Sequence, residues 1–376
     1  MSVTVKEVQS RKELRQFVKF PLHLYKDCPY YVPSIYLDEM STLDPAKNPM
    51  CRYSKFARFL AYKDGEIVGR VAAIINEIAN RDWNHQEVRF GWFDFIDDRE
   101  VSRALLEKVI EFGKQYGMTQ ISGPLGFTDF DSEGMVVEGF DQISSFMLKF
   151  NYPYYRNHME ALGYQKVIDW LEYRIYVPEE VPDKVVRMSK LIADRYHLHV
   201  RHITKKEVRK EDYGHKIFDM INKTYSELFD FTVMPPDVVD SYIDTFLGLL
   251  DMDFVVLIEN DEGEMAGFAI TMPSLARAVQ KGSGYLLPLG WWHLVKSMYI
   301  KHEEALELML IGVAPEYRNK GVNAMIFNEL IPRLQKGGFK YGESNAELED
   351  NNKVQNQWDL YEKDLQRRRR VYGKQI

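Results

Sequence analysis

The chain repeats one pattern twice, and this repeat constrains its fold more than any other feature. Each copy has an apolar strand, a tight turn with glycine and a second apolar strand, which together predict a β-hairpin. Gly65 and Gly69 of the first copy correspond to Gly263 and Gly267 of the second, so both glycines are displaced by 198 positions. A match of two separate glycines makes coincidence a poor explanation. The two hairpin segments are residues 59–75 and 254–270.

The elements around the hairpins repeat as well. A first strand precedes each hairpin, and an amphipathic helix that ends at glycine, followed by a short strand, comes after it. The displacement grows downstream, which places an insertion between Ser274 and Ile300. Strands that alternate with helices predict an α/β fold, in which a mixed, mostly antiparallel sheet is covered by helices. The repeated segments are 3–6 with 199–203, and 104–122 with 324–343.

The length of 376 residues is too great for one ordinary core and suits two domains. Residues 177–182 contain two prolines, which break regular structure. We therefore expect one domain at 1–180 and another at 181–376.

Composition excludes several classes of protein. No segment reaches the ~18 uninterrupted apolar residues that a membrane span needs, and the first twenty residues lack the apolar region of a secretory signal, so we expect a cytoplasmic protein. A net charge of −7 disfavours general nucleic-acid binding. The chain has only two cysteines, and its His, Cys and carboxylate residues show no spacing typical of metal ligands, so we expect no metal site. Arg367–Arg370 are expected on a solvated face or edge, with a cofactor phosphate or RNA as alternative contacts.

One loop carries a chemical signal. Residues 306–322 read as a buried strand, a proline-marked turn, a loop with glycine and basic residues, and the start of a helix. A helix N-terminus presents free N–H groups and partial positive charge, and a glycine permits close approach, so this combination favours a pyrophosphate. Arg318 and Lys320 would add positive charge. The glycines match neither the dinucleotide fingerprint nor the P-loop.

Residues 313–322 resemble the coenzyme A loop of the GNAT superfamily of N-acyltransferases, written [Q/R]xxGx[G/A]; Asn323 departs from the pattern, since the family prefers Gly or Ala there. Segments 123–127 and 290–292 also look like bacterial tandem-GNAT proteins. The resemblance implies tandem GNAT folds and transfer of an acetyl or other short acyl group from acyl-CoA, as co-substrate, to the amine of a small molecule or peptide.

The resemblance also implies binding positions. The family pairs the backbone of the strand before the loop with pantetheine, and an Asn-containing turn touches the same group. The implied cofactor-binding residues are Ile311, Gly312, Val313, Arg318, Asn319, Lys320, Gly321, Val322, Asn323 and Asn352.

Amine acylation needs a base for the acceptor and an acid for the departing thiolate. Glu307 lies where some family members hold a catalytic carboxylate, and strand alternation predicts that it shares a face with Ile311 and Val313. Tyr361 resembles the acid that the family carries on the helix after its fifth strand. A solvated or ion-paired Glu307 and a core Tyr361 are the alternatives.

The first half lacks the loop. Its equivalent segment, residues 93–100, has no glycine, and Asp97 and Asp98 fit helix caps better than a phosphate site. We expect a degenerate copy that shapes the acceptor site or supports the second half. The apolar segment 285–295 in the insertion fits a buried helix between the halves, a wall of the acceptor pocket or a membrane contact.

Two other functions remain open. Fem-type aminoacyl transferases also pair GNAT folds but take the acyl group from tRNA, which the acidic balance and the coenzyme A loop disfavour. A non-catalytic CoA-binding module is the other alternative, favoured if Glu307 and Tyr361 lie far from the loop. The acceptor, the acyl-chain length and the oligomeric state are left open.

Overall fold

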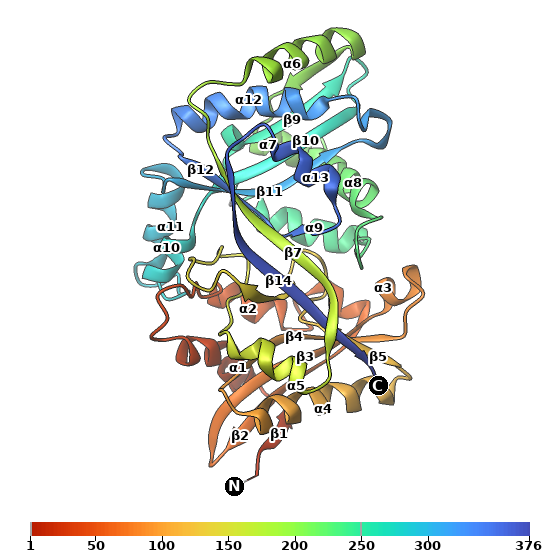
Figure 1. Cartoon of the computed structure of the whole chain (residues 1–376), viewed down its shortest axis with the longest axis vertical. Coiled ribbons are helices and arrows are strands. Elements are labelled where there is room, and N and C mark those ends of the chain that lie inside the picture. Colours follow the sequence, from red (N-terminus) through yellow and green to blue (C-terminus); the bar gives the residue numbers. More distant parts are fainter. Residues whose placement is uncertain (1, 249) are drawn as a thin grey trace.

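The computed structural model describes residues 2–248 and 250–376. Its centre is a single sheet to which both halves contribute, fourteen strands among the described residues. The first half lies below and the second above in Figure 1, with helices packed on the sheet. The mixed α/β fold and the mostly antiparallel sheet are therefore confirmed. The strand order along the main path is β1-β2-β3-β4-β5-β14-β7-β12-β11-β10-β9-β8, with β13 beside β7 and β6 beside β14.

The first half contains β1 (Thr4–Glu7), α1 (Arg11–Leu24), α2 (Tyr36–Thr42), η1 (Pro49–Arg52), β2 (Ser54–Lys63), β3 (Glu66–Asn76), α3 (Glu77–Asp82), β4 (Glu87–Phe95), α4 (Arg99–Gln115), β5 (Gln120–Gly123), β6 (Met135–Glu138), α5 (Tyr154–Ala161) and β7 (Gln165–Tyr176).

The second half contains α6 (Asp183–Tyr196), β8 (Leu198–Arg201), α7 (Lys205–Lys210), α8 (Tyr213–Tyr225), α9 (Pro236–Phe246), η2 (Met252–Phe254), β9 (Val255–Asn260), β10 (Met265–Pro273), α10 (Ala276–Lys281), α11 (Gly290–Tyr299), β11 (Ala305–Val313), η3 (Pro315–Tyr317), α12 (Val322–Lys336), β12 (Tyr341–Ser344), β13 (Glu347–Leu348), α13 (Asn352–Gln355), η4 (Asn356–Trp358) and β14 (Lys363–Gln375).

The repeated hairpins form as predicted. β2 pairs with β3, and β9 with β10, both antiparallel. Gly65 and Gly263 have φ of +86° and +79°, the left-handed conformation that glycine adopts without a steric penalty. After each hairpin, the next strand runs parallel to the strand that follows its helix: β4 beside β5, and β11 beside β12. The two halves thus place their fourth and fifth strands in the same relation.

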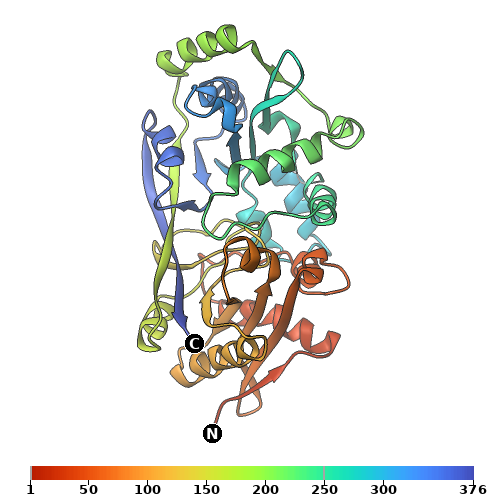
Figure 2. The ribbon, with the colours of Figure 1, turned by 90° about the vertical axis from the view of Figure 1, so that its right-hand side faces the viewer.

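The halves exchange strands near their junction. β14, the last strand of the chain, pairs with β5 of the first half, whereas β7 pairs with β12 of the second half. β7 and β14 also pair with each other, and they form the long twisted ribbon that joins the halves in Figures 1 and 2. The expected division at residue 180 stays a prediction, but each half of the sheet contains a strand from the other side of that position.

This exchange overturns the expectation of a solvated Arg367–Arg370 segment. β14 is an inner strand, and the side chains of Arg367 and Arg369 are only 3% and 0% exposed. Both donate to Glu172 on β7, with 2.7 Å from Arg367 Nε to Glu172 Oε2. Arg370 Nε donates to Asp169 at 2.7 Å. The cluster is an ion-pair network that holds β14 against β7, because a buried guanidinium needs a paired carboxylate.

Apolar clusters lie within each half and also between the halves. One cluster packs β3 and β4 under α4, and another packs β9, β10 and β11 under α12. A third cluster joins side chains of α1 and β3 to those of α8, α9 and β10. The two halves therefore share an apolar core. This core holds α1 and β3 of the first half against α8, α9 and β10 of the second.

The insertion forms α10 and α11, and its apolar segment is not a buried helix between the halves. Leu294 and Met298 of α11 pack inward, but Trp291 and Trp292 are 48% and 42% exposed. No helix among the described residues has the length and apolar character to cross a membrane.

Candidate active site

A cavity of about 550 Å³ opens beside the end of β11, within the ~300–1,000 Å³ range of ligand pockets. It forms where β11 and β12 separate, because their parallel pairing ends at Leu308 and Ser344. Most of the lining comes from the second half, and Asp129 and Glu133 come from a loop of the first half. Of the predicted cofactor-binding residues, the lining includes Ile311, Gly312, Val313, Arg318, Asn319, Gly321, Val322 and Asn323.

The loop before α12 has the backbone shape that the sequence predicted. Gly321 is the N-cap of α12 with φ of +88°, and Asn319 has φ of +62°, so the loop turns twice through the left-handed region. A Cβ at Gly321 would lie 3.2 Å from Met188 Cε on α6. The start of α12 lines the cavity at residues 321–323, and such a helix N-terminus fits the pyrophosphate of coenzyme A.

The basic residues of the loop have protein partners in this structure. Arg318 Nη2 donates to Thr224 O at 3.2 Å in the last turn of α8, and its Nη1 contacts Glu227, just after that helix, at 3.3 Å. Lys320 Nζ lies over the rings of Tyr196 and Tyr317, 4.8 and 5.3 Å from their centroids. Arg318 lines the cavity, whereas Lys320 is not part of its lining.

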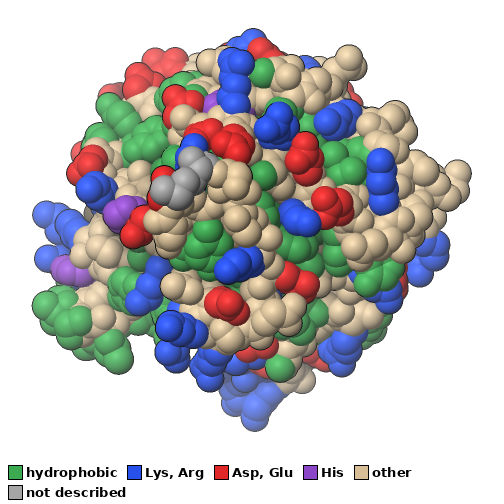
Figure 3. All heavy atoms as spheres, turned by 90° about the horizontal axis from the view of Figure 1, so that it is seen from below, with side chains coloured by type: hydrophobic (Ala, Val, Ile, Leu, Met, Phe, Trp, Pro, Cys, Tyr) green, Lys and Arg blue, Asp and Glu red, His purple; other side chains and the backbone are tan. Residues whose placement is uncertain are grey.

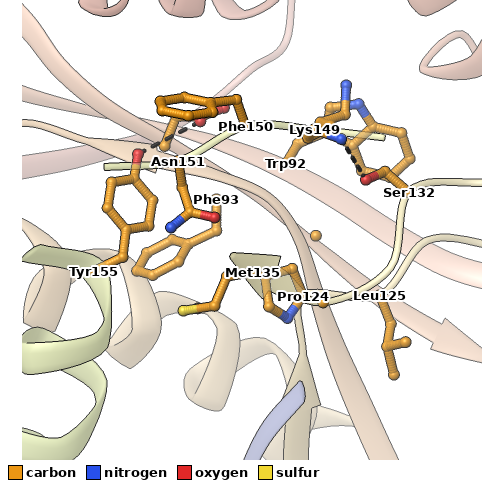
Figure 4. A pocket seen from close by; sticks show the side chains of 13 residues that line it. Trp92, Phe93, Pro124, Leu125, Ser132, Met135, Lys149, Phe150, Asn151 and Tyr155 are labelled. Atoms are coloured by element: carbon orange, nitrogen blue, oxygen red, sulfur yellow. Dashed lines mark hydrogen bonds between the residues drawn. The ribbon is translucent and has the colours of Figure 1, made fainter. Parts of the chain in front are cut away.

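The first half has no comparable opening at the equivalent place among its described residues. Beyond the parallel pairing of β4 and β5, the N–H of Leu125 donates to Phe90 O at 2.9 Å and closes the gap between the strands. The remaining pocket is about 30 Å³, and Figure 4 shows Phe93, Phe150 and Tyr155 around it. Only a molecule near the size of water fits there.

The helix start of the first half is occupied by its own carboxylates. Asp98 is the N-cap of α4, and its Oδ1 accepts from the N–H of Glu100 at 2.9 Å, as the sequence predicted. Asp97 instead lies 2.9 Å from Nε2 of His158. Negative charge at this helix start repels a phosphate.

Two curated proteins are similar to the chain over most of its length. Protein YghO of Escherichia coli K12 is 26% identical over 99% of this chain and 95% of its own. The bacterial ceramide synthase of Caulobacter vibrioides is 23% identical over 86% of this chain and 84% of its own. No family model matches the sequence.

Comparison with solved structures identifies the fold. A tandem GNAT protein from the clavulanic acid biosynthesis pathway superposes with a TM-score of 0.55 at 14% identity, covering 100% of this chain and 98% of that one. The chain has the tandem GNAT fold. A GCN5-related glucosamine N-acetyltransferase region of a fungal multi-domain β-N-acetylglucosaminidase gives a TM-score of 0.58 at 12% identity. The match covers 99% of this chain but only 38% of that longer one.

One feature of the GNAT strand before the loop differs from the sequence prediction. β10 and β11 shift register, so that Ile270 faces Leu310 while Thr271 faces Leu308, and Met309 is bulged out of the pairing. A bulge reverses the alternation of side chains, which places Glu307 on the opposite face from Ile311 and Val313. The expected shared face of Glu307 with these two residues is therefore wrong.

Glu307 lies away from the cavity lining. It is 6% exposed, and its Oε1 accepts from the Ser274 hydroxyl at 2.9 Å. Burial, with Glu343 as a second cause, raises the pKa of Glu307 to about 7. Its proposed role as base stays a prediction, but another carboxylate is better placed.

Tyr361 is not on a helix. It lies between η4 and β14, where its ring packs on Phe327 with centroids 5.6 Å apart. Phe327 lines the cavity and Tyr361 lies behind it, with a buried hydroxyl that has no hydrogen-bond partner among the described residues. At the Asn-containing turn, Asn351 lines the cavity, whereas Asn352 is exposed at the start of α13.

Tyr225, at the end of α8, was missed by the sequence analysis. Its hydroxyl donates to Ile311 O at 3.0 Å and accepts from Ile311 N at 3.3 Å. Its hydroxyl therefore contacts β11 beyond the point where β12 separates from that strand. This part of β11 is the segment predicted to pair with pantetheine. Burial raises the pKa of Tyr225 to about 12, so its hydroxyl keeps its proton at neutral pH.

Glu347, on the two-residue strand β13, was also missed. It lines the cavity, and Trp358 Nε1 donates to its Oε1 at 2.8 Å. Its other oxygen, Oε2, is buried with no hydrogen-bond partner among the described residues. Burial raises the pKa of Glu347 to about 7, although the Trp358 hydrogen bond and the charge of Lys363 oppose the shift. A carboxylate near its pKa at neutral pH can accept a proton from a bound amine.

The loop of the first half brings two more carboxylates to the cavity. Asp129 accepts from the N–H of Thr232 at 3.0 Å, and burial raises its pKa to about 7. Burial and the neighbouring Asp129 hold the pKa of Glu133 well above its usual range. Aromatic side chains line the same cavity; they include Trp170, Phe229, Phe231 and Trp358.

One cluster outside the cavity has metal-ligand residue types. Atoms of His85, Glu87 and Asp230 lie within 4.8 Å of one another. Arg89 Nη2 lies 2.7 Å from Asp230 Oδ2, so a guanidinium already supplies positive charge to these carboxylates. The cluster fits an internal ion-pair network that joins β4 to the second half.

Replacing Arg318 by alanine tests the loop. We expect the variant to lose a charge-assisted donor to phosphate worth roughly 1.5–3 kcal/mol, so that the affinity for acetyl-CoA falls about ten- to a hundredfold. Calorimetric titration measures the change. Arg99→Ala, at the equivalent helix start of the first half, is the control and should bind like the parent protein. Equal affinity of the Arg318 variant would mean that the loop is an ordinary turn.

Proposed function

We propose that the chain is an acyl-CoA-dependent N-acyltransferase, with an acetyl or other short acyl group as the first candidate to transfer. The observation that carries the proposal is the cavity of about 550 Å³, which has the glycine loop of α12 at one side and Glu347 at another. The tandem GNAT fold supports acyl transfer in general.

The loop residues would hold acyl-CoA. The N–H groups at the start of α12 and the side chain of Arg318 face the expected position of the pyrophosphate, and the β11 backbone at Ile311–Val313 faces that of pantetheine. Tyr225 now bonds both backbone groups of Ile311, so we infer that its hydroxyl turns away when pantetheine binds.

Glu347 and Tyr225 are the candidate base and acid. Glu347 takes a proton from the attacking neutral amine as the amine nitrogen forms a bond to the acyl carbonyl carbon. The carbon–sulfur bond breaks, and Tyr225 gives its proton to the departing thiolate. Exchange with solvent then removes the proton from Glu347 and restores that of Tyr225. Both groups line one cavity, and their protonation states at neutral pH fit these roles.

The acceptor is inferred to be an amine with an apolar body. Aromatic side chains line the cavity together with Glu347, and Asp129, with a pKa of about 7, offers a partly ionised carboxyl to an ammonium group. The similarity to a protein named bacterial ceramide synthase agrees with this class, because a ceramide is an amide of a long-chain amino alcohol.

Turnover tests the proposed function. The purified chain is incubated with acetyl-CoA or a longer acyl-CoA and a panel of amines that runs from amino acids to long-chain amino alcohols, and free thiol is measured. We expect thiol release that depends on the amine. Tight CoA binding without turnover of any amine would favour the non-catalytic module.

The two halves should differ in binding. Titration calorimetry is expected to give one acetyl-CoA per chain, because the equivalent gap in the first half is closed by Leu125 and its helix start is capped by Asp98. A stoichiometry near two would contradict the degenerate first half.

A further inference from the structure

A second feature of the molecule has no part in the proposed transfer. The helix α11 and the loop before it expose large apolar side chains, which we call the α11 surface. Its members and their exposed fractions are Leu287 (78%), Leu289 (62%), Trp291 (48%), Trp292 (42%), Tyr299 (49%) and Ile300 (61%). Side chains of this size seldom gather in the open on a soluble protein without a binding role.

The fold holds these side chains outward. Leu294 and Met298, on the other face of α11, pack against Val32 and Met272. The indole N–H of Trp291 donates to Pro288 O at 3.1 Å, and the two tryptophan rings lie 5.9 Å apart. Figure 3 shows hydrophobic side chains with basic ones beside them at the left edge, the side on which α10 and α11 lie in Figure 1. The exposure is thus a property of the packed helix.

The charge around the α11 surface is opposite to that of the whole protein. The chain has a net charge of −7, yet residues 265–302 contain no Asp or Glu. The same stretch contributes Arg277, Lys281, Lys296 and Lys301, all of them exposed. Arg277 has Glu303 at 3.8 Å, while the three lysines have no carboxylate within 4.0 Å among the described residues. The apolar side chains therefore lie within a basic region.

We propose that the α11 surface docks the protein on an anionic membrane. Indole rings prefer the boundary between headgroups and acyl chains, and lysines beside them attract anionic headgroups. A second copy of the chain fits less well, because a symmetric contact would bring the same lysines together. The negative charge elsewhere on the protein would be repelled by the membrane and would help to orient the contact.

Flotation of the full chain with lipid vesicles, in the absence of acyl-CoA, tests the proposal. Vesicles of phosphatidylcholine and phosphatidylglycerol in equal parts should carry the protein, vesicles of phosphatidylcholine alone should carry far less, and added salt should reduce binding. Trp291→Ser/Trp292→Ser and Lys296→Glu/Lys301→Glu should each weaken binding about tenfold or more. Lys190→Glu/Leu191→Ser, a basic and apolar pair exposed on α6, is the matched control and should float like the parent protein.

Two results would overturn the proposal. The first is a parent protein that does not float with anionic vesicles, or α11 variants that float as well as the parent. The second is a parent protein that sediments as a dimer and becomes monomeric in the tryptophan variant, which would assign the surface to a second copy. Acyl transfer to a soluble amine is measured without vesicles, so failure of docking and failure of the proposed activity are distinguishable.

Discussion

Replacing Glu347 by glutamine is expected to lower kcat by about 10²–10⁴-fold, the usual contribution of a general base. The substitution keeps the size of the side chain and can still accept from Trp358, so the fold should be retained. In the parent enzyme, activity should fall as the pH drops through about 7, because protonated Glu347 cannot accept a proton. The remaining activity of the variant should lose this dependence.

Glu307→Gln is the matched control for Glu347. Both carboxyls are buried with a pKa near 7, but Glu347 lines the cavity and Glu307 hydrogen-bonds to Ser274 outside the lining. The glutamine at 307 should leave kcat within a few-fold of the parent. The opposite pattern, with full activity in the 347 variant and loss in the 307 variant, would transfer the role of base to Glu307.

Gly321→Val is expected to abolish binding of acyl-CoA. The residue has φ of +88°, which a β-branched side chain adopts only with strain, and its Cβ would crowd Met188 on α6, so the loop that is proposed to hold the pyrophosphate should shift. A loss of affinity of at least about a hundredfold should follow. Calorimetry measures binding, and circular dichroism checks that the variant is folded.

Gly338→Val is the control that separates the effect of backbone strain from the effect of a changed binding loop in Gly321→Val. Gly338 follows the far end of α12, has φ of +76°, and has open space where a Cβ would lie. The two variants carry the same kind of strain, of order 1–2 kcal/mol. Only the variant at 321 should lose the ligand. Equal affinity of both variants for acyl-CoA would show that the loop at Gly321 does not hold the cofactor.

Local features were the ones that the sequence could predict. The hairpin glycines, the Asp98 cap and the glycine loop before α12 depend on residues close in sequence, whose conformational preferences act without the rest of the fold. The tandem fold followed from the repeat of these local patterns.

Features that depend on distant contacts could not be predicted. Arg369 became an inner-strand residue only because β14 pairs with both β5 and β7. The bulge at Met309 depends on the register of β10, and it moved Glu307 to the other face. Apolar composition suggested a buried α11, although composition alone does not say which face meets the core.

The missed cavity residues carried weak signals. Tyr225 is one of 23 tyrosines, and its position against Ile311 comes from the packing of α8 over β11. Glu347 lies on a strand of two residues, too short for a periodic pattern. A search for carboxylates within a few residues after the strand that follows the α12 helix would have included it.

A crystal structure with acetyl-CoA would show whether the cavity beside β11 is the cofactor site. We expect one molecule per chain, with its pyrophosphate within hydrogen-bond distance of the N–H groups at residues 321–323, its pantetheine beside β11, and its thioester between Tyr225 and Glu347. Acetyl-CoA bound in the first half, or bound in the second half with its pyrophosphate away from Gly321, would contradict the assignment of the site.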